Sequence, residues 1–234
     1  QGINLVFLGD GYNAENISNG EYMNAMREQV EHFFGIEPYA TYRDYFNVYT
    51  AIALSAESGI GTVNTIRYTR FETTFTGNDG LRCNNQAVFD YALKIPAITQ
   101  SNMNQSLIVI TPNTTEYSGI CHLWEDGSAI AICPMSTSAY PFDTRGVLQH
   151  EAGGHGFGKL ADEYIYHNEF IAFCCSVSVP ALRILQSLVW YQNLSLTGKM
   201  HQVPRSHLIF HECYTPIVEV FEGRFMHLPG VFRS

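Results

Sequence analysis

The segment HEAGGHGFGKLADEY (150–164) constrains the fold of this chain more than any other. It places Glu151 beside His150, and a second histidine, His155, follows five positions after the first. In a regular α-helix, residues five apart point about 140° away from each other around the axis, so the two rings would lie on different faces. The two glycines between them tolerate irregular backbone. We therefore predict a helix with a π-bulge at these glycines, which brings both imidazoles to one face.

Two imidazoles on one helix face, with a glutamate beside the first, are typical of zinc peptidases. In such a site the histidines bind Zn²⁺, and the glutamate acts as general base toward the Zn-activated water. The pattern predicts His150 and His155 as metal ligands and Glu151 as the catalytic base. The same residues also occur by chance on surface helices as a polar face. Four glycines within one helix, each costing about 1 kcal/mol relative to alanine, favour the functional interpretation.

A third ligand is expected after the helix ends. In the metzincin pattern, a glycine three residues beyond the second histidine, here Gly158, breaks the helix and returns the chain to the metal. The usual ligand position, six residues beyond that histidine, holds Ala161. Asp162 is the nearest residue able to bind a metal, and zinc accepts a carboxylate as third ligand. We predict Asp162, with the downstream histidines as alternatives: His167, His201, His207 and His211.

Further polar residues are candidates for substrate contacts. Peptide hydrolysis needs a group that stabilises the developing oxyanion, and Tyr164 follows the ligand segment. Tyr214 and two of the downstream histidines are alternatives for this role. Glu222 is a candidate for lining the substrate cleft, although its Glu-Gly pair is equally compatible with a turn. Asp143 and Arg145, just before the motif helix, are expected to cap the helix or form an ion pair.

Strand-length apolar runs alternate with stretches of helical periodicity along the first two-thirds of the chain. Strands are predicted at 3–8, 46–54, 106–112 and 128–134, and the last pairs with a preceding strand across an Asp-Gly turn. Helices are predicted at 21–35, 86–95 and 147–160. The order β-α-β-α-β-β-α indicates an α/β (α+β) fold, a mixed β-sheet with the active-site helix beneath it. In the last third, 181–191 is expected to be helical and 217–223 a strand or a helix.

The charge balance limits the class of partner. The formal net charge is −9, with 13 Lys and Arg against 22 Asp and Glu. Nucleic acids and anionic membrane surfaces are bound through clustered basic residues, which this chain lacks. No apolar run approaches the roughly 20 residues that span a bilayer. The sequence therefore predicts neither a nucleic-acid partner nor a membrane span.

The length of 234 residues suits a single catalytic domain, 1–234. A chain that opens on Gln1 and enters a strand almost at once is expected to be a fragment or processed part of a longer protein. Its six cysteines fit no zinc-ribbon spacing. Cys121 and Cys133 flank the predicted hairpin, so they are candidates for a disulfide; the alternative is that they are small buried hydrophobic residues.

Four segments of the chain resemble the IgA-peptidase-type zinc metallopeptidases: 3–12 (INLVFLGDGY), 33–59, 150–164 and 220–234. The resemblance implies a zincin fold of the metzincin type, one catalytic zinc, and a secreted, cell-surface or periplasmic endopeptidase. It also implies that His150 and His155 bind the zinc and that Glu151 is the catalytic base. Asp162 falls within the Asp-Glu-Tyr sequence of the family.

The chain departs from that family pattern in two ways. Many relatives have the shorter His-Glu-x-x-His spacing. The family pattern also continues past the position of Ser234 with a segment containing Cys and Met. The hydrophobic floor under the zinc is therefore expected either to be missing or to be supplied by Met200 or Met226.

The leading hypothesis is a zinc-dependent endopeptidase that hydrolyses extracellular proteins or peptides. The alternative from another class is a catalytically inactive binding module of the zincin fold that retains the metal site. The unusual histidine spacing favours the second, whereas the presence of Glu151 favours the first, because a binding module does not need the base. A zinc amidase or deacetylase is a third hypothesis, disfavoured by Gly158 and by the resemblance.

Overall fold

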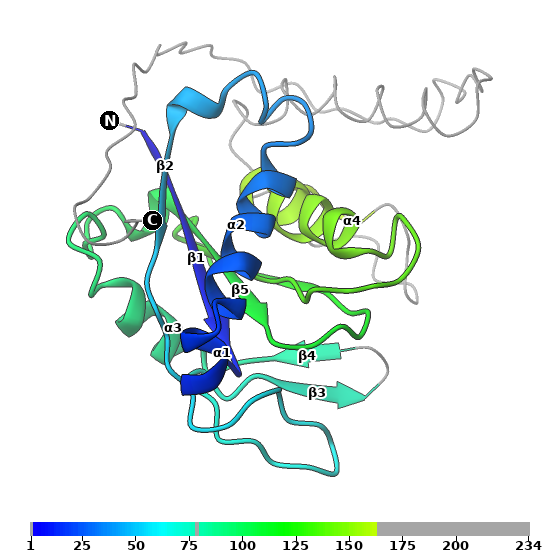
Figure 1. Cartoon of the computed structure of the whole chain (residues 1–234). Helices are drawn as coiled ribbons and strands as arrows, with labels where there is room; N and C mark the ends of the chain where they lie inside the picture. The colour runs from blue at the N-terminus through cyan, green and yellow to red at the C-terminus, as the bar shows by residue number, and fades with distance from the viewer. Residues whose placement is uncertain (1, 78–79, 163–234) are drawn as a thin grey trace, which may run out of the picture. The chain divides into compact units, whose positions relative to one another are not determined.

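The computed structural model describes residues 2–77 and 80–162. Its central sheet has the strand order β2-β1-β5-β7-β6, and only β6 runs antiparallel to its neighbour within this described part (Figure 1). The mixed sheet predicted from the sequence is confirmed. The strands are β1 (Ile3–Asp10), β2 (Phe46–Thr50), β5 (Ser106–Pro112), β6 (Ile120–Leu123) and β7 (Ala129–Ile132).

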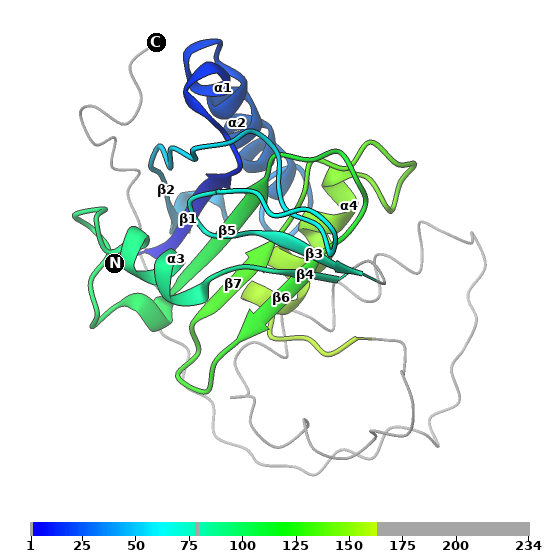
Figure 2. The ribbon, with the colours of Figure 1, turned by 90° about the horizontal axis from the view of Figure 1, so that it is seen from below.

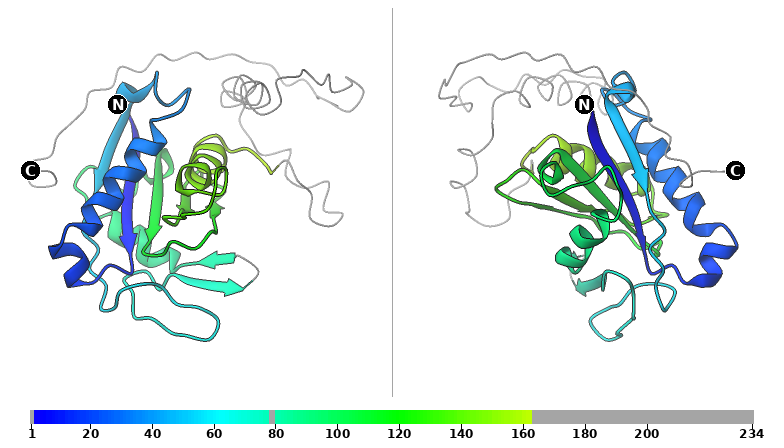
Figure 3. Two further views of the ribbon diagram at one scale, coloured as in Figure 1. Left: turned by 45° about the vertical axis from the view of Figure 1, so that its right-hand side comes forward. Right: turned by 90° about the vertical axis from the view of Figure 1, so that its left-hand side faces the viewer.

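Helices cover both faces of this sheet. Helix α2 (Glu21–Phe33) lies on one face and α3 (Asn85–Ala92) on the other (Figure 3). The face of α2 also carries α4 (Thr144–Leu148), which continues directly into a π-helix, η3 (Gln149–Phe157). The shorter elements are α1 (Ala14–Ser18) and the 3₁₀ turns η1 (Arg43–Tyr45) and η2 (Met103–Gln105).

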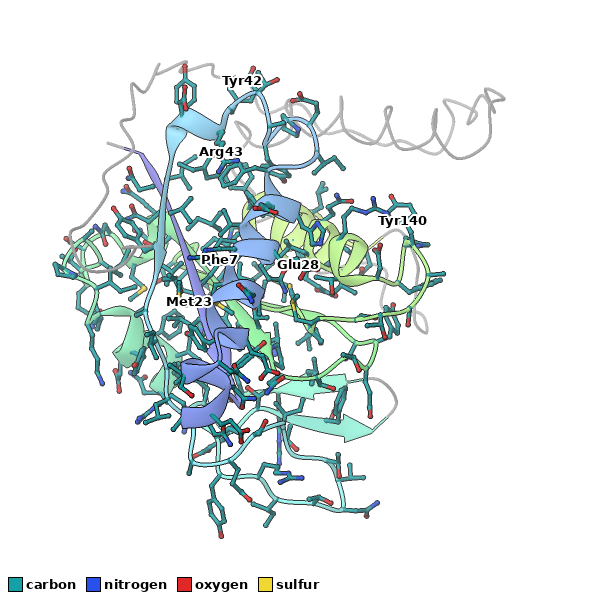
Figure 4. All side chains as sticks on the ribbon, in the orientation of Figure 1. Phe7, Met23, Glu28, Tyr42, Arg43 and Tyr140 are labelled. Atoms are coloured by element: carbon teal, nitrogen blue, oxygen red, sulfur yellow. The ribbon has the colours of Figure 1, made fainter. Side chains whose placement is uncertain are left out.

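The core divides into two clusters, one on each face of the sheet. Leu5 and Phe7 of β1 join α2, α4 and η3 in the first cluster, where Met23 of α2 packs at the margin (Figure 4). Val6 and Leu8 of the same strand join α3 in the second. Successive side chains of a strand point to opposite faces, so a strand covered on both sides is apolar throughout. This is why the runs INLVFL and SLIVITP could be predicted as strands.

A second, small sheet was not predicted. It pairs β3 (Thr74–Gly77) with β4 (Gly80–Arg82), in a region for which no strand or helix was predicted (Figure 2). The two strands are four and three residues long, too short for an alternating pattern to be recognised. Strand β4 contacts β6, so the hairpin borders the edge strand of the main sheet.

The carboxylate of Asp10 organises the carboxyl end of β1. It is fully buried and accepts four hydrogen bonds from the long connection between β2 and β3. Oδ1 accepts from the Phe71 N–H at 3.0 Å and the Ser55 hydroxyl at 3.2 Å, while Oδ2 accepts from the Thr73 N–H at 3.0 Å and the Thr69 hydroxyl at 2.9 Å. The buried charge is thereby compensated by hydrogen bonds, and it fastens this connection to the sheet.

Several predicted bounds need correction. The strand predicted at 46–54 ends at Thr50, and the one predicted at 128–134 covers Ala129–Ile132. The helix predicted at 147–160 begins at Thr144 and ends at Phe157. The elements expected at 181–191 and 217–223 lie outside the described residues. Among the described helices, none has the length and apolar character to span a membrane.

The candidate disulfide between Cys121 and Cys133 is not formed, and both thiols are free. In the β6–β7 ladder Cys121 stands opposite Ala131, so Cys133 lies diagonally across the two strands. Diagonal neighbours are about 7–8 Å apart, beyond the usual Cα separation of a disulfide. Cys133 is instead fully buried in the first core cluster, as the alternative reading expected.

Candidate metal centre

The helix that carries the motif begins at a well-defined N-cap. The Asp143 side chain accepts a hydrogen bond of 2.8 Å from the Gly146 N–H, and Arg145 pairs with the same carboxylate at 3.3 Å. The predicted capping and ion-pair roles of these two residues are confirmed. A Cβ on Gly146 would lie 1.9 Å from the Pro141 carbonyl oxygen, so glycine is required where the preceding loop crosses this first turn.

From Gln149 to Phe157 the helix is a π-helix, in which hydrogen bonds run from residue i to i+5. The Gly158 N–H donates such a bond, 3.0 Å long, to the Gly153 carbonyl. Residues five apart therefore lie above one another, which accommodates the five-residue spacing of the histidines. The predicted departure from α-helical geometry is confirmed, but it extends over the whole segment and is not a single bulge.

Two of the motif glycines allow close packing from outside the helix. A Cβ on Gly153 would lie 3.1 Å from the Tyr39 ring, and one on Gly156 would lie 2.6 Å from Leu107 of β5. Gly154 is different, because a Cβ there would meet nothing closer than 3.7 Å. Close packing against another segment therefore explains the glycine at 153, but it does not explain the glycine at 154.

The two histidine rings of the motif are in edge-to-face contact. The Nε2 atoms of His150 and His155 are 3.1 Å apart, and the ring planes are nearly perpendicular at 87°. The Nδ1 atom of His155 lies 2.7 Å from the Leu160 carbonyl oxygen. Because a carbonyl only accepts, Nδ1 carries a proton, and Nε2 is the nitrogen of this ring that is left to bind a metal. This is the hydrogen bond that orients metal-binding histidines in proteins.

The spacing of these nitrogens fits a metal ion. Two nitrogens bound at about 2.0–2.1 Å to one tetrahedral Zn²⁺ lie about 3.3 Å apart, close to the 3.1 Å observed. Asp162 offers a carboxylate oxygen, and the ligand atoms of the three residues lie within 4.8 Å of one another. Among the described residues this is the group that could hold a metal. The assignment of each residue as a ligand remains a prediction.

The chain turns after the π-helix at Lys159, one residue later than predicted. Gly158 keeps a helical φ of −75°, whereas Lys159 has a left-handed φ of 54°. The Lys159 ammonium donates to the Gly156 carbonyl at 2.7 Å and to the Gly127 carbonyl at 2.9 Å, and burial lowers its pKa. These bonds join the end of the helix to the β6–β7 turn, which compensates for the less favourable backbone conformation.

Glu151 points into the protein and not into solvent, with a relative exposure of 9%. Two thiols on β6 and after β7 are close enough to interact with its charge. Burial first, and the Glu151 carboxylate second, raise the pKa of Cys121 to about 12 and hold that of Cys133 well above its usual value. Both thiols are therefore neutral at physiological pH.

The other predicted site residues cannot be placed. Tyr164 and Glu222 lie outside the described residues, as do the alternatives His167, His201, His207, His211, Tyr214, Met200 and Met226. The structure adds Lys159 within the motif, and Tyr39 and Gly119 from other segments. Tyr39 contacts Gly153 and Gly119 contacts Glu151 through tertiary packing, so no spacing rule in the sequence could identify them.

A comparison with known protein families gives one match that covers most of the chain. The model of the family IgA peptidase M64 matches residues 1–178, more than half of the 234 residues. A comparison with curated proteins gave no match. The matched region contains the buried first strand, the π-helix and the three candidate metal ligands. The chain therefore belongs to the IgA peptidase M64 family, and it is a peptidase.

Proposed function

We propose that this chain is a zinc-dependent endopeptidase that hydrolyses peptide bonds of extracellular proteins, with Glu151 as general base. Membership of a metallopeptidase family supports the reaction class. The observation that carries the proposal is the 3.1 Å separation of the His150 and His155 Nε2 atoms. Two imidazole nitrogens this close together can bind one shared cation.

His150, His155 and Asp162 would hold the zinc. Two imidazole nitrogens and one carboxylate oxygen match the three-ligand set of catalytic zinc sites, which leave a further position open. When bound, zinc supplies Lewis acidity, which polarises a carbonyl and makes a water molecule a stronger acid. The Leu160 carbonyl holds the His155 ring in the tautomer needed for this role.

Glu151 would move the protons. Its carboxylate takes a proton from the attacking water and returns it to the nitrogen of the leaving amine. The side chain is nine-tenths buried, which restricts its motion and excludes competing solvent. The neighbouring thiols of Cys121 and Cys133 stay protonated, so they do not compete with the Glu151 carboxylate for the proton.

An inactive binding module that retains the metal is the alternative. The long histidine spacing was the feature that favoured it. The π-helix removes this reason, because residues five apart share a face there. The buried position of Glu151 also supports a catalytic role. A glutamate that belonged only to the polar face of a surface helix would be exposed.

The test is to measure bound metal and proteolysis in the same preparations. Purified chain is expected to contain one zinc and to cleave a denatured protein such as reduced casein. Glu151→Gln should retain zinc and lose activity, whereas His150→Ala should lose both. Glu125→Gln is a matched control, because this glutamate is exposed on the β6–β7 turn. Zinc-loaded wild type that cleaves no member of a broad protein panel would favour the binding module.

The site of action is part of the proposal. The resemblance to secreted peptidases supports a location outside the cytoplasm, and the acidic charge of −9 supports protein over nucleic acid as partner. Immunoblotting of the culture medium, envelope and cytosol of the source cells tests this. Detection in the cytosol alone would contradict it.

A further inference from the structure

Gly119 lies directly against the carboxylate of Glu151. A Cβ built on Gly119 would stand 2.7 Å from Glu151 Oε1, 2.9 Å from Glu151 Cγ and 2.9 Å from a methyl of Val147. Real Cβ atoms essentially never make contacts shorter than 3.0 Å. The Glu151 side chain therefore rests on the bare Cα of residue 119, in space that any other amino acid would fill.

The backbone at this position is held by the sheet. Gly119 immediately precedes β6, whose first residue, Ile120, pairs with Ile132 of β7. Its position relative to the π-helix is thus set by strand pairing and not by a flexible loop. On the helix side, Val147 of α4 is fully packed in the first core cluster. A side chain added at 119 would displace the flexible Glu151 side chain more easily than either backbone.

We propose that Gly119 is a positioning residue of the peptidase reaction, because its missing side chain sets where the Glu151 carboxylate stands. The inference rests on the proposed role of Glu151 as general base. Relief of a 2.7 Å contact to an ordinary separation of 3.4–4 Å moves Oε1 by about an ångström. Proton transfer requires the base within about 2.6–3.2 Å of its partner, and a misplacement of about 1 Å can cost about 10²-fold in rate.

The first experiment is Gly119→Ala in the zinc-loaded chain. The readouts are kcat and KM on reduced casein, zinc per chain and melting temperature. We expect kcat to fall about 10- to 100-fold, with zinc content unchanged and KM within about twofold. Ile120→Val is the matched control, since this next residue packs on the opposite face of the sheet and should keep wild-type kcat. An unchanged kcat in Gly119→Ala would overturn the proposal.

A second variant separates displacement of the carboxylate from displacement of the helix. Val147→Ala removes the methyl that the new Cβ would meet, but leaves Glu151 in its way. Gly119→Ala/Val147→Ala should therefore keep the loss of kcat. Full recovery of kcat in this double variant would mean that the helix, and not the carboxylate, was displaced, and would overturn the proposal.

A double-mutant cycle on stability tests the proposal even if Gly119→Ala alone does not fold. Glu151→Ala deletes Cγ and Oε1, the atoms that the new Cβ would meet. Gly119→Ala should thus be less destabilising in the Glu151→Ala background than in wild type, and Glu151→Ala should recover folded protein if Gly119→Ala alone does not fold. Equal destabilisation in both backgrounds would sink the proposal.

The proposed function fails in a distinguishable way. If Glu151→Gln is as active as wild type, the base assignment is wrong, and the Gly119 proposal falls with it. If Glu151→Gln is inactive while Gly119→Ala keeps full kcat, only the Gly119 proposal is wrong.

Discussion

The Tyr39 hydroxyl donates a hydrogen bond of 2.7 Å to the Gly153 carbonyl oxygen, midway between the two histidines of the π-helix. The same carbonyl accepts the 3.0 Å bond from the Gly158 N–H that defines the π-helical turn. The ring of Tyr39 occupies the space beside the Cα of Gly153, where a Cβ would lie 3.1 Å from it. The connection after α2 therefore contacts the middle of the π-helical segment through this carbonyl.

Tyr39→Phe should destabilise the fold by about 0.5–1.5 kcal/mol, because the ring stays and one hydrogen bond is lost. Urea unfolding followed by circular dichroism measures this as a lower midpoint with an unchanged slope. Tyr42→Phe, on an exposed ring of the same connection, is the control and should have no effect. Equal midpoints for the two variants would contradict a role for the Tyr39 hydroxyl.

Zinc should stabilise the folded chain through the histidine pair. A ligand that binds only the native state stabilises it by about 2.7 kcal/mol at a hundredfold excess over its Kd. The melting temperature of metal-free protein should therefore rise on zinc addition, and this rise should vanish in His155→Ala. His32→Ala is the control, because His32 lies on α2 and pairs with Glu28 at 3.3 Å. A zinc-dependent rise that survives in His155→Ala would exclude His155 as a ligand.

Much of the fold could be predicted because burial leaves a pattern in the sequence. The runs at 3–8 and 106–112 are apolar at every position, since helices cover both faces of their strands. The α2 helix shows helical periodicity because one of its faces packs on the sheet. The β3–β4 hairpin has neither property, so it could not be recognised.

The site was only partly predictable, for a different physical reason. Histidines five residues apart cannot share one face of a regular α-helix, so the hypothesis of a shared metal ion required a distorted helix. The contacts of Tyr39 and Gly119 with this helix depend on tertiary packing between distant segments. A single sequence carries no spacing rule for such contacts. The turn at Lys159 was misplaced because glycine is the usual left-handed residue, whereas here the lysine side chain compensates with two hydrogen bonds.

Asp10→Asn should be among the more destabilising changes away from the metal centre. An amide has one acceptor oxygen and one donor NH₂, so at least one backbone N–H that now bonds the carboxylate would face another donor. Loss of hydrogen bonds to a buried charge costs about 1.5–3 kcal/mol. Chemical denaturation measures the loss, and Asp44→Asn, at an exposed position, is the control. A midpoint equal to that of the control would mean that the network around Asp10 contributes nothing to stability.

Alkaline pH should destabilise the chain through its buried thiols. Burial, with a smaller contribution from the Asp10 carboxylate, raises the pKa of Cys83 from 9.0 to about 12. Between these values the unfolded chain has released the thiol proton while the folded chain keeps it. Because the unfolded state then binds fewer protons, stability falls as pH rises, by up to about 1.4 kcal/mol per pH unit for one thiol.

Urea unfolding under reducing conditions at pH 8, 9, 10 and 11 measures this dependence. Cys83→Ala should show a smaller loss of stability between pH 9 and 11 than wild type, because one raised thiol pKa is removed. Part of the loss should persist in the variant, since burial also raises the pKa of Tyr22 to about 12 and that of Cys121 to the same value. Identical pH profiles for wild type and Cys83→Ala would show that the Cys83 thiol titrates alike in the folded and unfolded chain.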